Sequence, residues 1–168
     1  MKLSVKRLDA QGRYESTIAR DDGVRFRLKG HDCALALPHD IAHYIVENAL
    51  GLEGGFWGRV AAGGVFPSMT YVDGRRRPKA AERSKTALRA DPDELADAEV
   101  LVRIFSDTIR EGHDATTLIL SARLNGRRLA RSRPQIAAAQ IAAIFARYKD
   151  LRARWAELPV GGAIELEW

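Results

Sequence analysis

Short segments at both ends of the chain alternate apolar and polar residues, and this pattern constrains the fold more than any other feature. Near the N-terminus Leu3 and Val5 alternate with polar neighbours, and residues 24–28 repeat the pattern after turn-rich segments. A period of two predicts strands with one buried and one solvated face. The last six residues show it again, with the apolar set Ile164, Leu166 and Trp168. We therefore expect an antiparallel meander that the C-terminal strand joins, closing residues 1–168 into a single domain.

Helical periodicity fills the chain between these strands. A short helix is predicted around Phe56–Ala61, ending at the glycines that follow it, and a longer one from a capped start at Asp91 to about Glu111. A last helix is predicted from apolar residues spaced by fours and threes between Ala137 and Leu158. The segment from His113 to Leu129 fits a hairpin or a helix, with the helix slightly favoured. The predicted class is α+β, a small antiparallel sheet packed with four or five helices.

Composition and charge indicate the cellular compartment and limit the partners that we expect. The chain has 168 residues, a net charge of +5 and one cysteine, so it forms no internal disulfide and fits a reducing compartment. No apolar signal core follows the N-terminus, and no apolar run is long enough for a bilayer, so we expect a cytoplasmic protein without membrane contact. The basic stretch Arg75–Arg89 is interpreted as a solvated helix face. Nucleic-acid binding through Arg75, Arg76 and Arg77 is possible but not favoured, because no aromatic residue is interleaved for base stacking.

The central stretch HDCALALPHDIAHYIVE, residues 31–47, holds three of the four histidines and the only cysteine. Pro38 suits the first helical position, and Asp40 places a negative charge at the positive end of the helix dipole. A helical wheel separates two halves. The apolar half, which we expect to face the core, comprises Ile41, Ala42, Ile45, Val46 and Ala49. The polar half comprises His39, Asp40, His43, Tyr44, Glu47 and Asn48.

Two histidines one turn apart, His39 and His43, can chelate one cation from the same helix face. With Asp40 they form the segment HDIAH, which resembles the HExxH helix of the zincin metallopeptidases. The order of an opening sheet followed by this helix is also similar to the zincin layout. The resemblance implies a zinc-dependent hydrolase, including peptidase activity, on a peptide or small-molecule substrate. It assigns water activation to Asp40, whose side chain is one methylene shorter than the zincin glutamate.

The third zinc ligand is expected from another element. Residues eight apart on a helix are separated by about 12 Å along its axis, so Glu47 cannot share a metal with both histidines. In the gluzincin branch of the zincins the third ligand is a glutamate from a later helix, which points to Glu99 in this chain. His113 is the second candidate.

Two other interpretations compete with the zincin hypothesis. The segment Leu37–Ile41 resembles the helix of HD-domain phosphohydrolases, where a histidine–aspartate pair binds a divalent metal on an all-helical fold. The third interpretation is a non-enzymatic basic binding protein with a structural metal or none. In that case His39 and His43 belong to a hydrogen-bonded polar edge of a structural helix, and Cys33 is a small buried hydrophobe.

Overall fold

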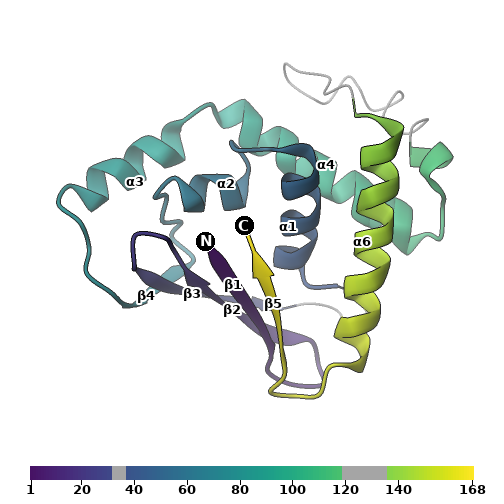
Figure 1. Ribbon diagram of the computed structural model, residues 1–168, viewed down its shortest axis with the longest axis horizontal. Helices are drawn as coiled ribbons and strands as arrows, with labels where there is room; N and C mark the ends of the chain where they lie inside the picture. The colour runs from purple at the N-terminus through teal and green to yellow at the C-terminus, as the bar shows by residue number, and fades with distance from the viewer. Residues whose placement is uncertain (32–36, 119–135) are drawn as a thin grey trace.

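The computed structural model describes residues 1–31, 37–118 and 136–168. Its sheet has five strands in the order β4-β3-β2-β1-β5, and every neighbouring pair is antiparallel (Figure 1). The strands are β1 (Lys2–Arg7), β2 (Arg13–Ala19), β3 (Arg25–His31), β4 (Met69–Asp73) and β5 (Ala163–Glu167). The predicted meander is β1-β2-β3, and the predicted return of the C-terminal strand is confirmed as the pairing of β5 with β1.

The alternation seen in the sequence becomes the two faces of this sheet. Leu3 and Val5 of β1 are fully buried, while the intervening residues are partly or fully exposed. The same face carries Ile18 of β2, Phe26 of β3 and Ile164 of β5, all buried. Apolar side chains on one face need a covering layer, since their burial contributes about 25 cal/mol per Å² of apolar surface removed from water.

The two chain ends lie side by side in the middle of the molecule (Figure 1). The Trp168 N–H donates to the Met1 carbonyl at 2.8 Å, and the Met1 ammonium donates to the Trp168 carbonyl at 3.1 Å. The glutamates of β5 lie opposite polar residues of β1, in the register Lys2↔Glu167 and Ser4↔Glu165.

Helices supply the covering layer. They are α1 (His39–Leu50), α2 (Phe56–Ala61), α3 (Ala80–Arg89), α4 (Pro92–Arg110) and α6 (Ala138–Glu157). Helix α1 packs against α4 and α6 (Figure 1), and Trp155 of α6 makes an edge contact with Tyr14 of β2, their ring centroids 6.3 Å apart. Within the described ranges, no helix has both the length and the apolar character that crossing a bilayer requires. The predicted α+β class is confirmed, and its sheet does not fit the all-helical fold that the HD-domain alternative requires.

The helix boundaries largely follow the sequence signals. The predicted helices over 56–61 and from the Asp91 cap are present, and the Asp91 carboxylate accepts the Asp93 N–H at 3.1 Å. The buried stripe of α6 comprises Ile141, Ile144, Tyr148, Leu151 and Trp155. Most of the ambiguous segment from His113 to Leu129, and Cys33, lie outside the described residues.

Strand β4 was not predicted from the sequence, which gave no assignment for the residues between the glycine-rich segment and the basic stretch. It is an edge strand that pairs only with β3, with a register shift between Arg25 and Phe26, and its burial does not alternate. An edge strand that lacks a fully buried face shows little period-two signal, which explains why the sequence pattern did not reveal it.

Buried Arg59 connects three helices. Its side chain, 2% exposed, donates to the carbonyls of Gly54 at 2.7 Å and Leu88 at 2.8 Å, and also to those of Ala87 and Asp91. The guanidinium thus satisfies carbonyls at the end of α3, which have no partner within their own helix. It holds α2, α3 and the start of α4 together around one charge.

Candidate metal centre

Helix α1 positions the candidate centre. It begins at His39, with Pro38 as its N-cap rather than its first helical residue, and ends at Gly51, which adopts a left-handed conformation with φ 65°. Its polar half is more buried than the sequence suggests. Asp40, His43, Tyr44 and Glu47 are all buried, so both halves of α1 pack against protein. The reason is that β2, α2 and α4 surround the helix, and each brings hydrogen-bonding groups to the polar half.

Three side chains converge at the exposed end of this helix, as the sequence predicted. They are His39 and His43 of α1 and Glu99 of α4, whose potential ligand atoms all lie within 4.8 Å of one another. His39 Nε2 lies 3.0 Å from His43 Nε2, and Glu99 Oε2 lies 3.3 Å from His43 Nε2 and 3.8 Å from His39 Nε2. Glu99 is therefore the candidate that the fold brings to the histidine pair.

The three atoms are spaced as ligands of one small cation would be. They form a triangle with sides of 3.0, 3.3 and 3.8 Å. The circle through its corners (product of the sides divided by four times the area) has a radius of about 2.0 Å, and zinc bonds to imidazole nitrogen and carboxylate oxygen measure about 2.0–2.2 Å. An ion close to this plane would lie within bonding distance of all three atoms.

The triad of His39, His43 and Glu99 is buried on the His43 side and open to solvent on the other side. The His43 side chain is 4% exposed, whereas His39 is 63% exposed and Glu99 is 52% exposed. Three protein ligands with a solvent-facing side leave room for a water or substrate as a further ligand, which is the arrangement typical of catalytic rather than structural zinc.

Glu47 fixes the orientation of His43. Its fully buried carboxylate lies 2.7 Å from His43 Nδ1 and accepts the backbone N–H groups of Phe56 and Trp57, both at 2.9 Å. Because Glu47 accepts from two backbone donors, it acts as the acceptor toward His43 also, and the Nδ1 atom carries the hydrogen. The neutral imidazole then presents the Nε2 lone pair to the triad, and such a carboxylate–histidine pair supports many metal ligands.

Space for the Glu47 carboxylate depends on Gly55, the residue before α2. A Cβ atom at this position would overlap the carboxylate of Glu47. The glycine-rich segment after α1 therefore serves the centre by letting the start of α2 approach Glu47 closely. Glu47 is outside the group of His39, His43 and Glu99, and its supporting role was not predicted from the sequence. The signal was available, since His43 and Glu47 are four residues apart on one helix face.

Electrostatics around His43 favour a cation. Burial opposes its protonation, but hydrogen bonds to Glu47 and Glu99 outweigh burial and raise the pKa of His43 to about 9. The same contacts, from His39 first and then His43, hold the pKa of Glu99 well below its usual range. The metal-free centre thus stabilises a positive charge between two carboxylates, and a bound metal ion would take the place of the proton on His43 Nε2.

No family model, curated protein or solved structure matches this chain. The zincin resemblance consequently rests on the HDIAH segment and on the convergence of His39, His43 and Glu99.

Asp40, the predicted catalytic base, points toward the sheet. Its carboxylate accepts the Ser16 hydroxyl at 2.5 Å and the Tyr14 hydroxyl at 3.2 Å, both from β2. Burial raises the pKa of Asp40, against the opposing effect of these two hydrogen bonds. Its carbonyl oxygen accepts the Trp57 indole N–H at 2.9 Å. These contacts tie the first turn of α1 to β2 and α2, and the base role stays a prediction from the sequence pattern.

The remaining candidates lie apart from the triad. His113, the alternative third ligand, lies beyond the end of α4 and pairs with Glu111 at 3.3 Å, and it is not a member of the converging group. Arg75, Arg76 and Arg77 are exposed and precede α3, a helix in which no residue is buried. The interpretation of the 75–89 stretch as a solvent-facing segment therefore agrees with the structure.

Proposed function

We propose that this protein is a zinc-dependent hydrolase whose metal ion is held by His39, His43 and Glu99. The single observation that carries the proposal is the triangle of ligand atoms, with sides of 3.0, 3.3 and 3.8 Å. The circle through these atoms has a radius of about 2.0 Å, which matches the bond lengths of zinc to nitrogen and oxygen. Two imidazoles and one carboxylate form a donor set that suits zinc among the common divalent metals. A metal at this position supplies Lewis-acid chemistry, polarising a water or a substrate oxygen.

Each residue of the site has a distinct role in this proposal. Glu47 orients His43 and keeps its Nε2 directed at the metal position. His39 and Glu99 complete the ligand set from the solvent side, where a substrate has access. Asp40 is proposed, from its position in the HDIAH segment, as the carboxylate that assists proton transfer from water.

Elemental analysis of protein purified without an affinity tag tests the metal assignment. We expect about one zinc ion per chain in the wild type. His39→Ala and Glu99→Gln should each lose most of it, and because both side chains are largely exposed, neither change disturbs the core. His113→Ala is the matched control and should keep full zinc. Full zinc in a His39→Ala, His43→Ala double variant would overturn the site.

Hydrolysis is tested separately on a panel of peptide, ester and phosphoester substrates. Removal of the metal with a chelator should abolish turnover, and added zinc should restore it. Equal turnover in metal-free and reconstituted protein would contradict the proposal. Full zinc occupancy without turnover on any substrate would assign the ion a structural role, which is the non-enzymatic alternative.

A further inference from the structure

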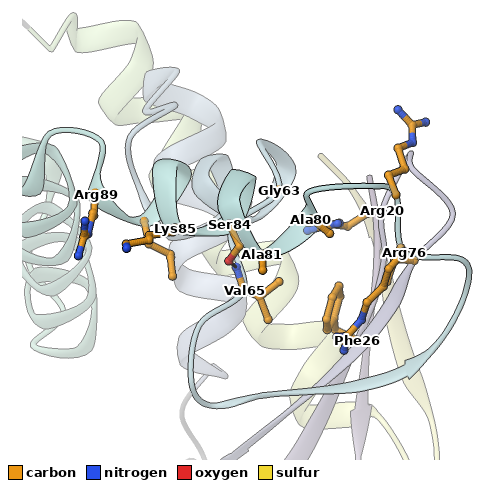
Figure 2. Close-up of a pocket in the computed structure, with 13 residues that line it drawn as sticks. Arg20, Phe26, Gly63, Val65, Arg76, Ala80, Ala81, Ser84, Lys85 and Arg89 are labelled. Carbon is orange, nitrogen blue, oxygen red and sulfur yellow. Dashed lines mark hydrogen bonds between the residues drawn. The ribbon is translucent and has the colours of Figure 1, made fainter.

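A hollow lies between helix α3 and the sheet, away from the metal centre. It has a volume of about 590 Å³, which is within the range of small-molecule sites. Figure 2 shows the side chains that surround it, with α3 on one side and Phe26 of β3 on the other. The connection from α2 to β4 contributes Gly63 and Val65.

The hollow exists because α3 does not pack down on the sheet. No residue of α3 is buried, although one flank of the helix is formed by small and apolar residues. That flank, with Ala81, Ser84 and Leu88, lines the hollow. Val24, which precedes β3, and Phe26 of β3 provide an apolar wall across from it, and both are buried. An apolar flank that faces a hollow instead of the core is available to a ligand with an apolar body.

The lining is strongly basic. It contains the five cationic side chains of Arg20, Arg76, Arg77, Lys85 and Arg89 and no carboxylate. The last four make no ion pair with any residue in the described ranges. The Arg76 guanidinium lies over the Tyr71 ring, 4.4 Å from its centroid. Cations gathered around a concave surface reinforce one another's field, which favours an anionic ligand.

Arg20 gives an independent indication of a ligand. Its side chain is only 6% exposed, and its Nε and Nη2 atoms donate to the Asp22 carboxylate at 3.1 and 2.5 Å. The guanidinium carbon lies 5.1 Å from the Phe26 ring centroid. Its Nη1 atom is buried and has no hydrogen-bond partner among the described residues. An unpaired buried donor destabilises a folded protein, and Arg20 lines the hollow, so a ligand acceptor that reached this donor would remove that cost.

We propose that this hollow is a binding site for a small molecule that carries a phosphate group on an apolar body. Asp22 pairs with Arg20 and also attracts Arg77, so the five cations of the lining still outnumber this one carboxylate. A phosphate dianion with three acceptor oxygens suits the excess positive charge better than a single carboxylate does. The Ser84 hydroxyl accepts the Val65 N–H at 3.0 Å, so its own hydrogen is free to be donated. The apolar body would lie between Leu88 and Phe26.

A small molecule fits the hollow better than a nucleic-acid strand does. The basic residues surround a pocket beneath α3 and do not follow an open groove, and no aromatic residue lies between Arg75 and Arg89 to stack on successive bases. The proposal is independent of the metal centre, since none of the lining residues belongs to it.

Isothermal titration calorimetry with phenyl phosphate tests the proposal. We expect saturable binding that is tighter than for inorganic phosphate, because the phenyl ring contacts the apolar wall, and no measurable binding of phenol. Lys85→Gln and Arg77→Gln should each weaken phenyl phosphate binding about tenfold, since each removes one charge-assisted contact. Arg83→Gln is the matched control, because Arg83 is an exposed cation of α3 outside the lining, and it should leave the affinity nearly unchanged.

A variant that fills the space provides a second test. Ala81→Leu places an apolar side chain in the hollow at an exposed helical position, so it should preserve folding by circular dichroism and abolish binding. Three results would overturn the proposal. They are the absence of saturable phenyl phosphate binding, an equal loss of affinity in Arg83→Gln and Lys85→Gln, and binding of a short single-stranded oligonucleotide that phenyl phosphate does not displace.

Discussion

Nδ1 of His43 donates its hydrogen to the carboxylate of Glu47 across 2.7 Å, one helical turn away, in the interior of the protein. This bond determines which nitrogen of His43 faces Glu99 and His39. It connects the core, where Glu47 is fully buried, to a cluster of polar side chains that is otherwise open to solvent.

Glu47→Gln tests the contribution of this bond. The amide of glutamine offers one acceptor oxygen where the carboxylate offers two, so its NH₂ group would face a donor, either His43 or a backbone N–H of α2. We expect a loss of about 1–3 kcal/mol in the free energy of unfolding and a 10–100-fold lower zinc affinity. Chemical denaturation and competition with a zinc chelator measure the two quantities.

Glu53→Gln is the control for that substitution, because Glu53 is an exposed carboxylate in the adjacent loop. It should change neither stability nor zinc affinity. Unchanged zinc affinity in Glu47→Gln would show that Glu47 does not support the centre.

Zinc affinity should depend on pH because of His43. Its pKa in the folded, metal-free protein is about 9, above the ordinary 6.5, so the bound proton stabilises the fold below pH 6.5, and this contribution is lost as the pH rises through 9. Zinc must displace that proton. The affinity should therefore rise about tenfold per pH unit between pH 7 and 8.5 and level off above 9. A pH-independent affinity in that range, measured with a competing chelator, would contradict the assignment of His43 as a ligand.

Asp40→Asn separates the base role from a positioning role. Asparagine keeps an acceptor for one of the two hydroxyls, and Ser16 can turn its hydroxyl to accept from the amide. We therefore expect the variant to retain zinc and to change the free energy of unfolding by no more than about 1 kcal/mol. If Asp40 acts as the base, hydrolysis falls sharply in this variant. Unaltered turnover with zinc still bound would assign Asp40 to holding α1 on the sheet.

Arg59→Lys tests the junction of three helices. Lysine is also positively charged, but it cannot reproduce the planar set of donors that contacts the backbone carbonyls of Gly54, Ala87, Leu88 and Asp91. We expect a loss of about 2–3 kcal/mol in the free energy of unfolding, since several partly buried carbonyls lose their partners and the charge of a buried side chain loses its acceptors. Arg83→Lys, an exchange at an exposed position of α3, should have no effect.

Much of the fold was predictable because local patterns of apolar and polar residues indicate most of its strands and helices. The period-two segments of β1, β3 and β5 each expose one face to solvent, and their alternation marks them as strands. Helices α4 and α6 have apolar residues at helical spacing, and Asp91 is a capping residue whose side chain binds the backbone of the first turn. Strand β4 was missed because an edge strand without a fully buried face lacks that alternation.

For the metal centre, sequence spacing alone placed His39 and His43 on one helix face, because residues four apart lie one turn apart whatever surrounds the helix. The choice of Glu99 over His113 rested on a family resemblance, and the packing of α4 against α1 is what brings Glu99 within 3.3 Å of His43. Distances between separate elements depend on how the whole core packs. Local spacing cannot supply them.

The burial of the polar half of α1 was decided by the tertiary structure alone. From the sequence, Asp40 and Glu47 are charged residues that ordinarily face water. They can be buried here because β2 supplies two hydroxyls to Asp40, and α2 supplies two backbone N–H groups to Glu47. A charged group leaves water only when hydrogen-bonding partners replace its hydration, and those partners come from segments distant in sequence. The sequence by itself determined which residues α1 carries, and the fold decided which of them are buried.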